Sequence, residues 1–119
     1  MWPALTFRDV DTMIDWLRAV GFTEHATYRN DAGEVEHAEW LWPEGGGIMF
    51  GSDTNGIVRN AGGSAVYLIT QDPDGAFERA LSAGASVARA LEDNEYGGRG
   101  GSVVDPEGNH WSFGSYQPS

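Results

Sequence analysis

An internal repeat constrains this chain more than any other feature of its sequence. The first copy consists of Asp9, Met13, Ile14, Leu17 and Gly21, and the second, 63 positions later, of Asp72, Ala76, Phe77, Ala80 and Gly84. Self-similarity in one constant register is the signature of two copies of one structural unit. Because 119 residues suit a single domain, we expect two similar halves that share one core rather than two independent domains.

Each copy of the repeat predicts one helix. An aspartate side chain at the start can accept hydrogen bonds from the free backbone N–H groups of the first turn. The apolar residues that follow at i, i+3, i+4 and i+7 fall on one helical face. A glycine then suits the left-handed conformation that ends many helices. Pro73 fits the first turn of the second helix, where no backbone N–H is needed.

Short apolar or aromatic stretches on both sides of the helices predict strands. In the first half these are 3–7, 26–29, 35–42 and 48–50, and in the second half 65–70, 86–91, 102–105 and 110–116. Turn-forming residues separate them, as in Asn30-Asp31-Ala32-Gly33. Each half therefore reads β-α-β-β-β, an α+β fold. We expect a first module at 1–51, a linker at 52–63 rich in Gly, Asn, Asp and Ser, and a second module at 64–119.

Composition and charge exclude several classes of chemistry. The 18 acidic residues outnumber the 7 basic ones, and the net charge of −11 disfavours nucleic acid and favours cationic small molecules. Without cysteine the chain has no thiolate for catalysis or for metal binding. Without lysine it has no amine for a Schiff base or a Walker A phosphate loop. The first twenty residues hold no apolar run of signal-peptide or membrane length, so we expect a cytoplasmic protein.

The segment Asp105-Pro106-Glu107-Gly108-Asn109-His110-Trp111-Ser112-Phe113-Gly114 is the most distinctive motif. Together with the repeat and the helix-ending glycines, it resembles the vicinal oxygen chelate superfamily over almost the whole chain. That superfamily contains glyoxalase I, extradiol dioxygenases, fosfomycin-modifying enzymes and bleomycin-resistance binding proteins. The resemblance implies two tandem βαβββ modules whose curved sheets surround a cleft, usually in a homodimer.

In the enzymes of this superfamily, His, Gln or Glu side chains from the first and last strand of each module bind a metal. The resemblance places these positions at Trp2, Met49, Ala65 and Ser112. Only the serine has an oxygen, and it is a poor ligand for a divalent metal. We therefore expect no metal, no cofactor and no catalytic residue.

Alternation along the strands separates core from cleft. The expected core residues are Leu5, Phe7, Phe50, Trp111 and Phe113, and Ala4 and Ile69 face the cleft. In the third strand we favour His37, Glu39 and Leu41 facing inward, and we place Tyr96 and Arg99 at the cleft mouth. The candidate ligand-binding residues are Trp2, Thr6, His37, Glu39, Met49, Tyr67, Tyr96, Arg99, His110 and Ser112.

An apolar, aromatic cleft in an acidic protein suits a planar or cationic ligand. Together with the resemblance, which implies a homodimer, this predicts a protein that sequesters a bulky aromatic or cationic natural product, as the antibiotic-resistance members of the superfamily do. Two alternatives remain open. One is a metal-dependent lyase, isomerase or dioxygenase that recruits its metal through His37, His110 and Glu39, and the other is a metabolite-sensing binding module.

Overall fold

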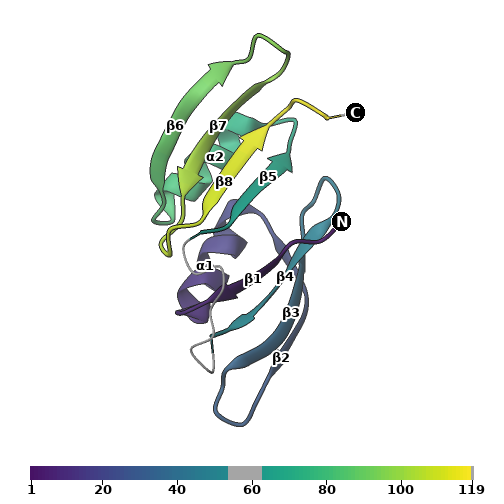
Figure 1. The fold of residues 1–119 in the computed structure, drawn as a ribbon, viewed down its shortest axis with the longest axis vertical. Coiled ribbons are helices and arrows are strands. Elements are labelled where there is room, and N and C mark those ends of the chain that lie inside the picture. Colours follow the sequence, from purple (N-terminus) through teal and green to yellow (C-terminus); the bar gives the residue numbers. More distant parts are fainter. Residues whose placement is uncertain (54–62, 119) are drawn as a thin grey trace.

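Two consecutive units with the same order of elements make up the structure, a computed structural model that describes residues 1–53 and 63–118 (Figure 1). The first unit contains β1 (Ala4–Phe7), α1 (Val10–Val20), β2 (Thr23–Arg29), β3 (Val35–Leu41) and β4 (Gly47–Ser52). The second contains β5 (Ala65–Ile69), α2 (Pro73–Ser82), β6 (Ser86–Asp93), β7 (Arg99–Val104) and β8 (His110–Gly114). The predicted α+β fold with two tandem βαβββ modules is confirmed. Most of the expected linker at 52–63 lies outside the described residues, and Ser52 belongs to β4.

Each module forms one four-stranded mixed sheet. The strand orders are β1-β4-β3-β2 and β5-β8-β7-β6, so the two sheets have the same topology. The pairs β1–β4 and β5–β8 are parallel, and the remaining pairs are antiparallel. The two sheets lie one above the other along the long axis of the molecule, with β1 and β5 adjoining at the middle (Figure 1).

The helices begin and end as the repeat predicts. The Asp9 carboxylate accepts hydrogen bonds from the Thr12 backbone N–H and hydroxyl, and the Asp72 carboxylate accepts one from the Gly75 N–H. Gly21, with φ of 132°, stands at the end of α1, and Gly84, with φ of 118°, follows α2. Both angles fall in the region that glycine adopts most readily. Within the described part of the chain, neither helix has the length and apolar character needed to cross a membrane.

One core of aromatic side chains joins the two modules. The Trp16 indole N–H on α1 donates to the Ala80 carbonyl on α2 at 3.1 Å, and the Trp42 indole N–H donates to the Ile69 carbonyl at 2.8 Å. The rings of Trp16 and Trp111 lie 5.4 Å apart across the boundary. The predicted core residues Leu5, Phe7, Phe50, Trp111 and Phe113 are all buried, as expected. The modules therefore share a single hydrophobic core.

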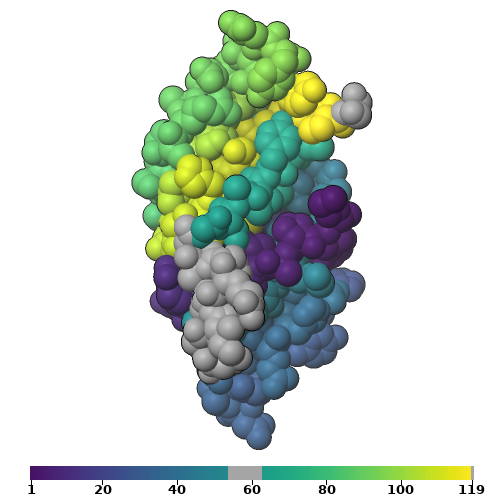
Figure 2. Space-filling model, viewed as in Figure 1, coloured from purple at the N-terminus to yellow at the C-terminus, as the bar shows by residue number. Residues whose placement is uncertain are grey.

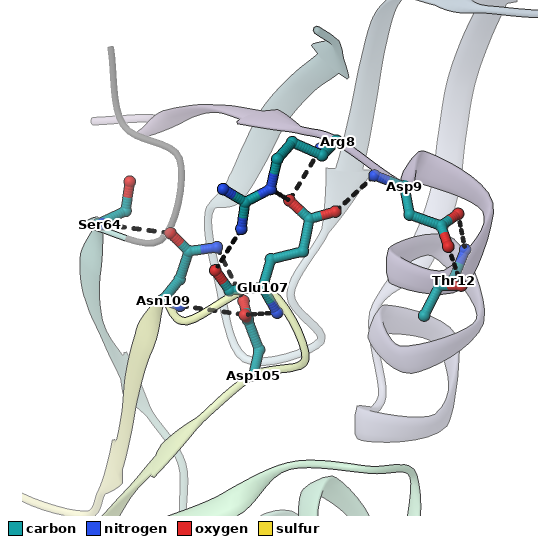
Figure 3. A network of polar contacts seen from close by, with 7 residues as sticks. All are labelled: Arg8, Asp9, Thr12, Ser64, Asp105, Glu107 and Asn109. Carbon is teal, nitrogen blue, oxygen red and sulfur yellow. Dashed lines mark hydrogen bonds and ion pairs between the residues drawn. The ribbon is translucent and has the colours of Figure 1, made fainter. Parts of the chain in front are cut away.

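The turn between β7 and β8 is organised by the buried carboxylate of Asp105. It accepts hydrogen bonds from the backbone N–H groups of Glu107 (2.7 Å) and Asn109 (3.0 Å), and from the side-chain N–H groups of Asn109 (3.0 Å) and Trp111 (2.8 Å). The Asn109 side-chain oxygen accepts in turn from the Ser64 backbone N–H, just before β5 (Figure 3). A buried carboxylate is tolerated because N–H donors surround it.

Glu107 in the same turn reaches across to the first module (Figure 3). Its carboxylate accepts hydrogen bonds from the backbone N–H groups of Arg8 at 2.8 Å and Asp9 at 2.6 Å. The Arg8 guanidinium also donates to the Glu107 carbonyl at 3.1 Å. Since these N–H groups immediately precede α1, one side chain of the second module fixes the start of a helix in the first.

The Glu107 contact gives the first testable prediction. In Glu107→Gln, one carboxylate oxygen becomes an amide nitrogen, which cannot accept the second backbone N–H. We expect the free energy of unfolding to fall by about 1.5–3 kcal/mol, the typical contribution of a hydrogen bond to a charged group. Urea denaturation measures this, and Glu95→Gln, in the β6–β7 loop, is the matched control. Equal stability of the two variants would show that Glu107 does not connect the modules energetically.

Candidate ligand-binding faces

Each sheet has one face covered by the helices and one open face. On β3, Ala38 and Trp40 are fully buried beneath α1, whereas His37, Glu39 and Leu41 remain partly exposed on the opposite face. β8 behaves in the same way: Trp111 and Phe113 are buried, and His110 and Ser112 alternate with them. The open faces are therefore the sheet surfaces that a ligand can reach.

The two open faces meet where β5 passes the N-terminal residues. Figure 2 shows the teal strand β5 and the purple N-terminal segment side by side across the middle of the molecule. A groove of about 290 Å³ at this junction is lined by Met1, Pro3, Ala65, Val66 and Tyr67. The volume is small for a drug-sized ligand, so a larger ligand needs surface from the open faces as well.

The open face of the first module combines aromatic rings with a histidine–glutamate pair. The Trp2 ring lies over Gly47 of β4, so closely that a side chain at position 47 would collide with it. On β3, His37 Nε2 and Glu39 Oε2 lie 2.8 Å apart. The Tyr28 ring of β2 stacks on the His37 ring, with centroids 6.3 Å apart and an interplanar angle of 19°.

The open face of the second module is built around Tyr67. Its ring lies over Gly114, and its hydroxyl donates to the Tyr116 carbonyl at 2.6 Å. The Tyr116 ring contacts Tyr96 edge to face, with centroids 4.9 Å apart. On the same face the hydroxyls of Ser102 and Ser112 lie 2.7 Å apart. The open face of the second module therefore has an aromatic region beside a region that carries hydroxyl groups.

The structure distributes the sequence-predicted ligand-binding residues over both faces. The first module's open face holds Trp2, Thr6, His37, Glu39 and Met49, and the second module's holds Tyr67, His110 and Ser112, with Tyr96 in the adjacent loop. Trp2 and Tyr67 are 38% and 42% exposed, so both rings are available for contact.

The structure does not place Arg99 at the mouth of the predicted cleft. Arg99 begins β7, where it alternates with Gly101 and Val103, which face α2. Its side chain therefore points to the helix side of the sheet and donates two hydrogen bonds to Asp74 in the first turn of α2, at 2.8 and 3.2 Å. These hydrogen bonds hold the pKa of the Asp74 carboxyl below its usual value. Arg99 anchors α2 and takes no part in the open face.

Three residues that the sequence analysis did not select belong to the open faces. Tyr28 is the cross-strand partner of His37, Arg89 that of Ser102, and Tyr116 follows β8. Arg89 forms an ion pair with Glu92 at 2.7 Å. Strand alternation alone could not select Tyr28 or Arg89, because register shifts interrupt both edge-strand pairings. Tyr28 and Arg89 can be identified only once the pairing register of the strands is known.

The tryptophans contribute less to the open faces than their number suggests. Of the five in the chain, Trp16, Trp40, Trp42 and Trp111 are buried, and only Trp2 lies on an open face. Each buried indole N–H donates to an oxygen within the protein. The tryptophan content of the chain thus mainly serves its core.

The four side chains that the resemblance places at metal-binding positions do not suit a divalent metal. Of Trp2, Met49, Ala65 and Ser112, only Ser112 has an oxygen, and its hydroxyl is already engaged with that of Ser102. Residues 1–53 and 63–118 also hold no group of three or more His, Asp or Glu side chains arranged to bind a metal ion.

The chain matches a protein-family model over residues 2–113, described as the Glyoxalase/Bleomycin resistance protein/Dioxygenase superfamily. An uncharacterized protein of Mycobacterium bovis is 35% identical over 122 residues, covering 94% of this chain and 80% of the relative. A counterpart in Mycobacterium tuberculosis H37Rv has the same identity and is covered over 71% of its length.

Several solved structures share the fold. TioX from Micromonospora sp. ML1 superimposes with a TM-score of 0.78 and 31% identity, covering 98% of both chains. The bleomycin resistance determinant encoded on the transposon Tn5 has a TM-score of 0.71 and 18% identity, covering 99% of this chain and 98% of its own. A bleomycin-binding protein in complex with bleomycin has a TM-score of 0.67 and 20% identity, covering 98% of both chains. At these last two identities the likeness shows the fold alone.

Tyr67 gives a prediction about pH. Partial burial raises the pKa of its phenol above the usual value of about 10. A folded-state pKa above the unfolded one stabilises the fold at neutral pH, and this stabilisation is lost as pH rises past the folded-state value. Ultraviolet titration should therefore show one of the four tyrosines ionising after the others, and Tyr67→Phe should remove that late step. Tyr28→Phe is the control, and a late step that survives Tyr67→Phe would contradict the assignment.

Proposed function

The chain belongs to the glyoxalase/bleomycin resistance protein/dioxygenase superfamily, and from this membership we propose that it binds a small molecule reversibly and without a metal. The observation that carries the proposal is the donor set at the four metal positions, where three side chains have no oxygen or nitrogen suited to a divalent cation. Binding alone lowers the free concentration of the ligand, so sequestration requires no bond to form or break.

The ligand that suits these faces is a bulky aromatic or cationic natural product. Flat surface is supplied by Trp2, Tyr28 and Tyr67, on which planar groups stack. The net charge of −11 attracts cations, and the exposed rings add cation–π contacts. Two relatives of the same fold carry bleomycin in their names, one as a resistance determinant and one as a complex, which supports a role in antibiotic resistance or self-resistance.

We further propose that a second copy of the chain closes the cleft. In the single chain the open face of each module is exposed to solvent, and the large rings on it remain substantially exposed. Two copies related by a two-fold axis can bring the open face of a first module opposite that of a second module. Such a homodimer contains two equivalent composite clefts.

A fluorescence titration tests sequestration. Because Trp2 alone among the tryptophans lies on an open face, a panel of aromatic and cationic antibiotics, added in the presence of a chelator, should quench its emission saturably. We expect micromolar affinity or better, about −8 kcal/mol. Trp2→Phe should remove most of the quenching, and N-acetyltryptophanamide controls for absorption by the ligand. A response abolished by the chelator, or no response across the panel, would contradict metal-free sequestration.

Light scattering after size-exclusion chromatography tests the dimer. The chain mass is 12.9 kDa, so the main species should have twice that mass at the concentrations used for ligand binding. Trp2→Asp and Tyr67→Asp should shift the equilibrium toward monomer, because the charge would be buried without a partner between the two faces. A monomer that binds ligand with full affinity would overturn the composite cleft.

A further inference from the structure

On the open face of the first module, three side chains from β2 and β3 form one connected unit. Tyr28 and His37 are cross-strand partners whose rings stack, and His37 Nε2 lies 2.8 Å from Glu39 Oε2. A carboxylate can only accept hydrogen bonds, so Nε2 carries the hydrogen of this contact. The orientation of the imidazole is therefore set on one side by the phenol ring and on the other by the carboxylate.

The unit has unused acceptors but no unused N–H donor. With the hydrogen on Nε2, the Nδ1 atom of neutral His37 is an acceptor. Among the described residues, Glu39 has His37 as its ion-pair and hydrogen-bond partner, and no contact engages its second oxygen, Oε1. The side chains are 45% and 37% exposed, so both acceptors can be reached from solvent. The second module's open face differs, because its Glu92 carboxylate is already paired with the Arg89 cation.

We propose that Tyr28, His37 and Glu39 form a subsite for an N–H-rich cation joined to a flat ring, such as an amidinium or a protonated arylamine. This inference rests on the proposed binding function and specifies its ligand. The cation donates hydrogen bonds to Glu39 Oε1 and His37 Nδ1, and its ring lies against the exposed face of Tyr28. An anion at the same place is repelled by the Glu39 carboxylate, so the unit discriminates by charge.

Three small probes of one shape test the charge requirement. Benzamidine is cationic, benzamide neutral and benzoate anionic, and each is titrated while the backbone amide signals are followed by NMR. Benzamidine should produce saturable shifts centred on β2 and β3, benzamide weaker ones and benzoate none. The benzamidine shifts should shrink at high salt, because the site is exposed to solvent.

Matched variants test the residues. Glu39→Gln keeps an oxygen that accepts from His37 but loses the charge, and it should weaken benzamidine binding about tenfold or more. Glu24→Gln is the control, since it removes the same charge from the same sheet. Glu24 lies across from the buried Trp40, on the helix side, and pairs with Arg18. This control should bind benzamidine almost as wild type does.

Equal losses in the two variants would mean that only overall charge matters, and that result would overturn the subsite. Shifts centred away from β2 and β3, or equal binding of benzoate, would overturn it as well. The outcome is separable from that of the proposed function. An antibiotic that binds equally to wild type and Glu39→Gln refutes the subsite and leaves sequestration intact. Benzamidine binding that depends on Glu39, with no binding of any antibiotic, would support the subsite and contradict sequestration.

Discussion

The arrangement of the two modules depends on the turn between β7 and β8. Asp105 is buried, and four N–H donors converge on its carboxylate, which gives the turn a single conformation. That conformation presents Glu107 to the backbone N–H groups that precede α1. Once the start of α1 is fixed, Trp16 can reach the Ala80 carbonyl on α2, and the helices form the shared core. The open face of each sheet is then the face that points away from the helices.

Features with local causes could be predicted from the sequence. Asp caps, apolar periodicity and terminal glycines predicted both helices, and alternation predicted the buried faces of β1 and β8, because each pattern depends on residues close in the chain. Arg99 was misplaced since its partner, Asp74, lies on α2, and since the glycine-rich segment before it concealed where β7 begins. Tyr28 was missed because its relation to His37 depends on the register between two strands. The sequence therefore predicts the fold more completely than it predicts the candidate binding site.

The division of aromatic residues between core and open face has a physical basis. An indole buried in protein needs a partner for its N–H, and Trp42 finds one in the Ile69 carbonyl of the other module. Such pairs fix the position of one module against the other more sharply than aliphatic contacts do. Tyr28, Tyr67 and Tyr96 remain substantially exposed, and they supply most of the flat aromatic area on the surface of the protein.

The two copies of the repeat have also diverged on their open faces. Positions that correspond across the two modules hold Ala4 and Tyr67, Met49 and Ser112, and Gly47 and His110. The two modules therefore share one topology but carry different surfaces. Under the proposed binding function, a ligand that spans both kinds of face would have only one favourable direction, because its two ends would meet different surfaces. A duplicated scaffold has in this way acquired polarity, which would favour molecules whose two ends are chemically different.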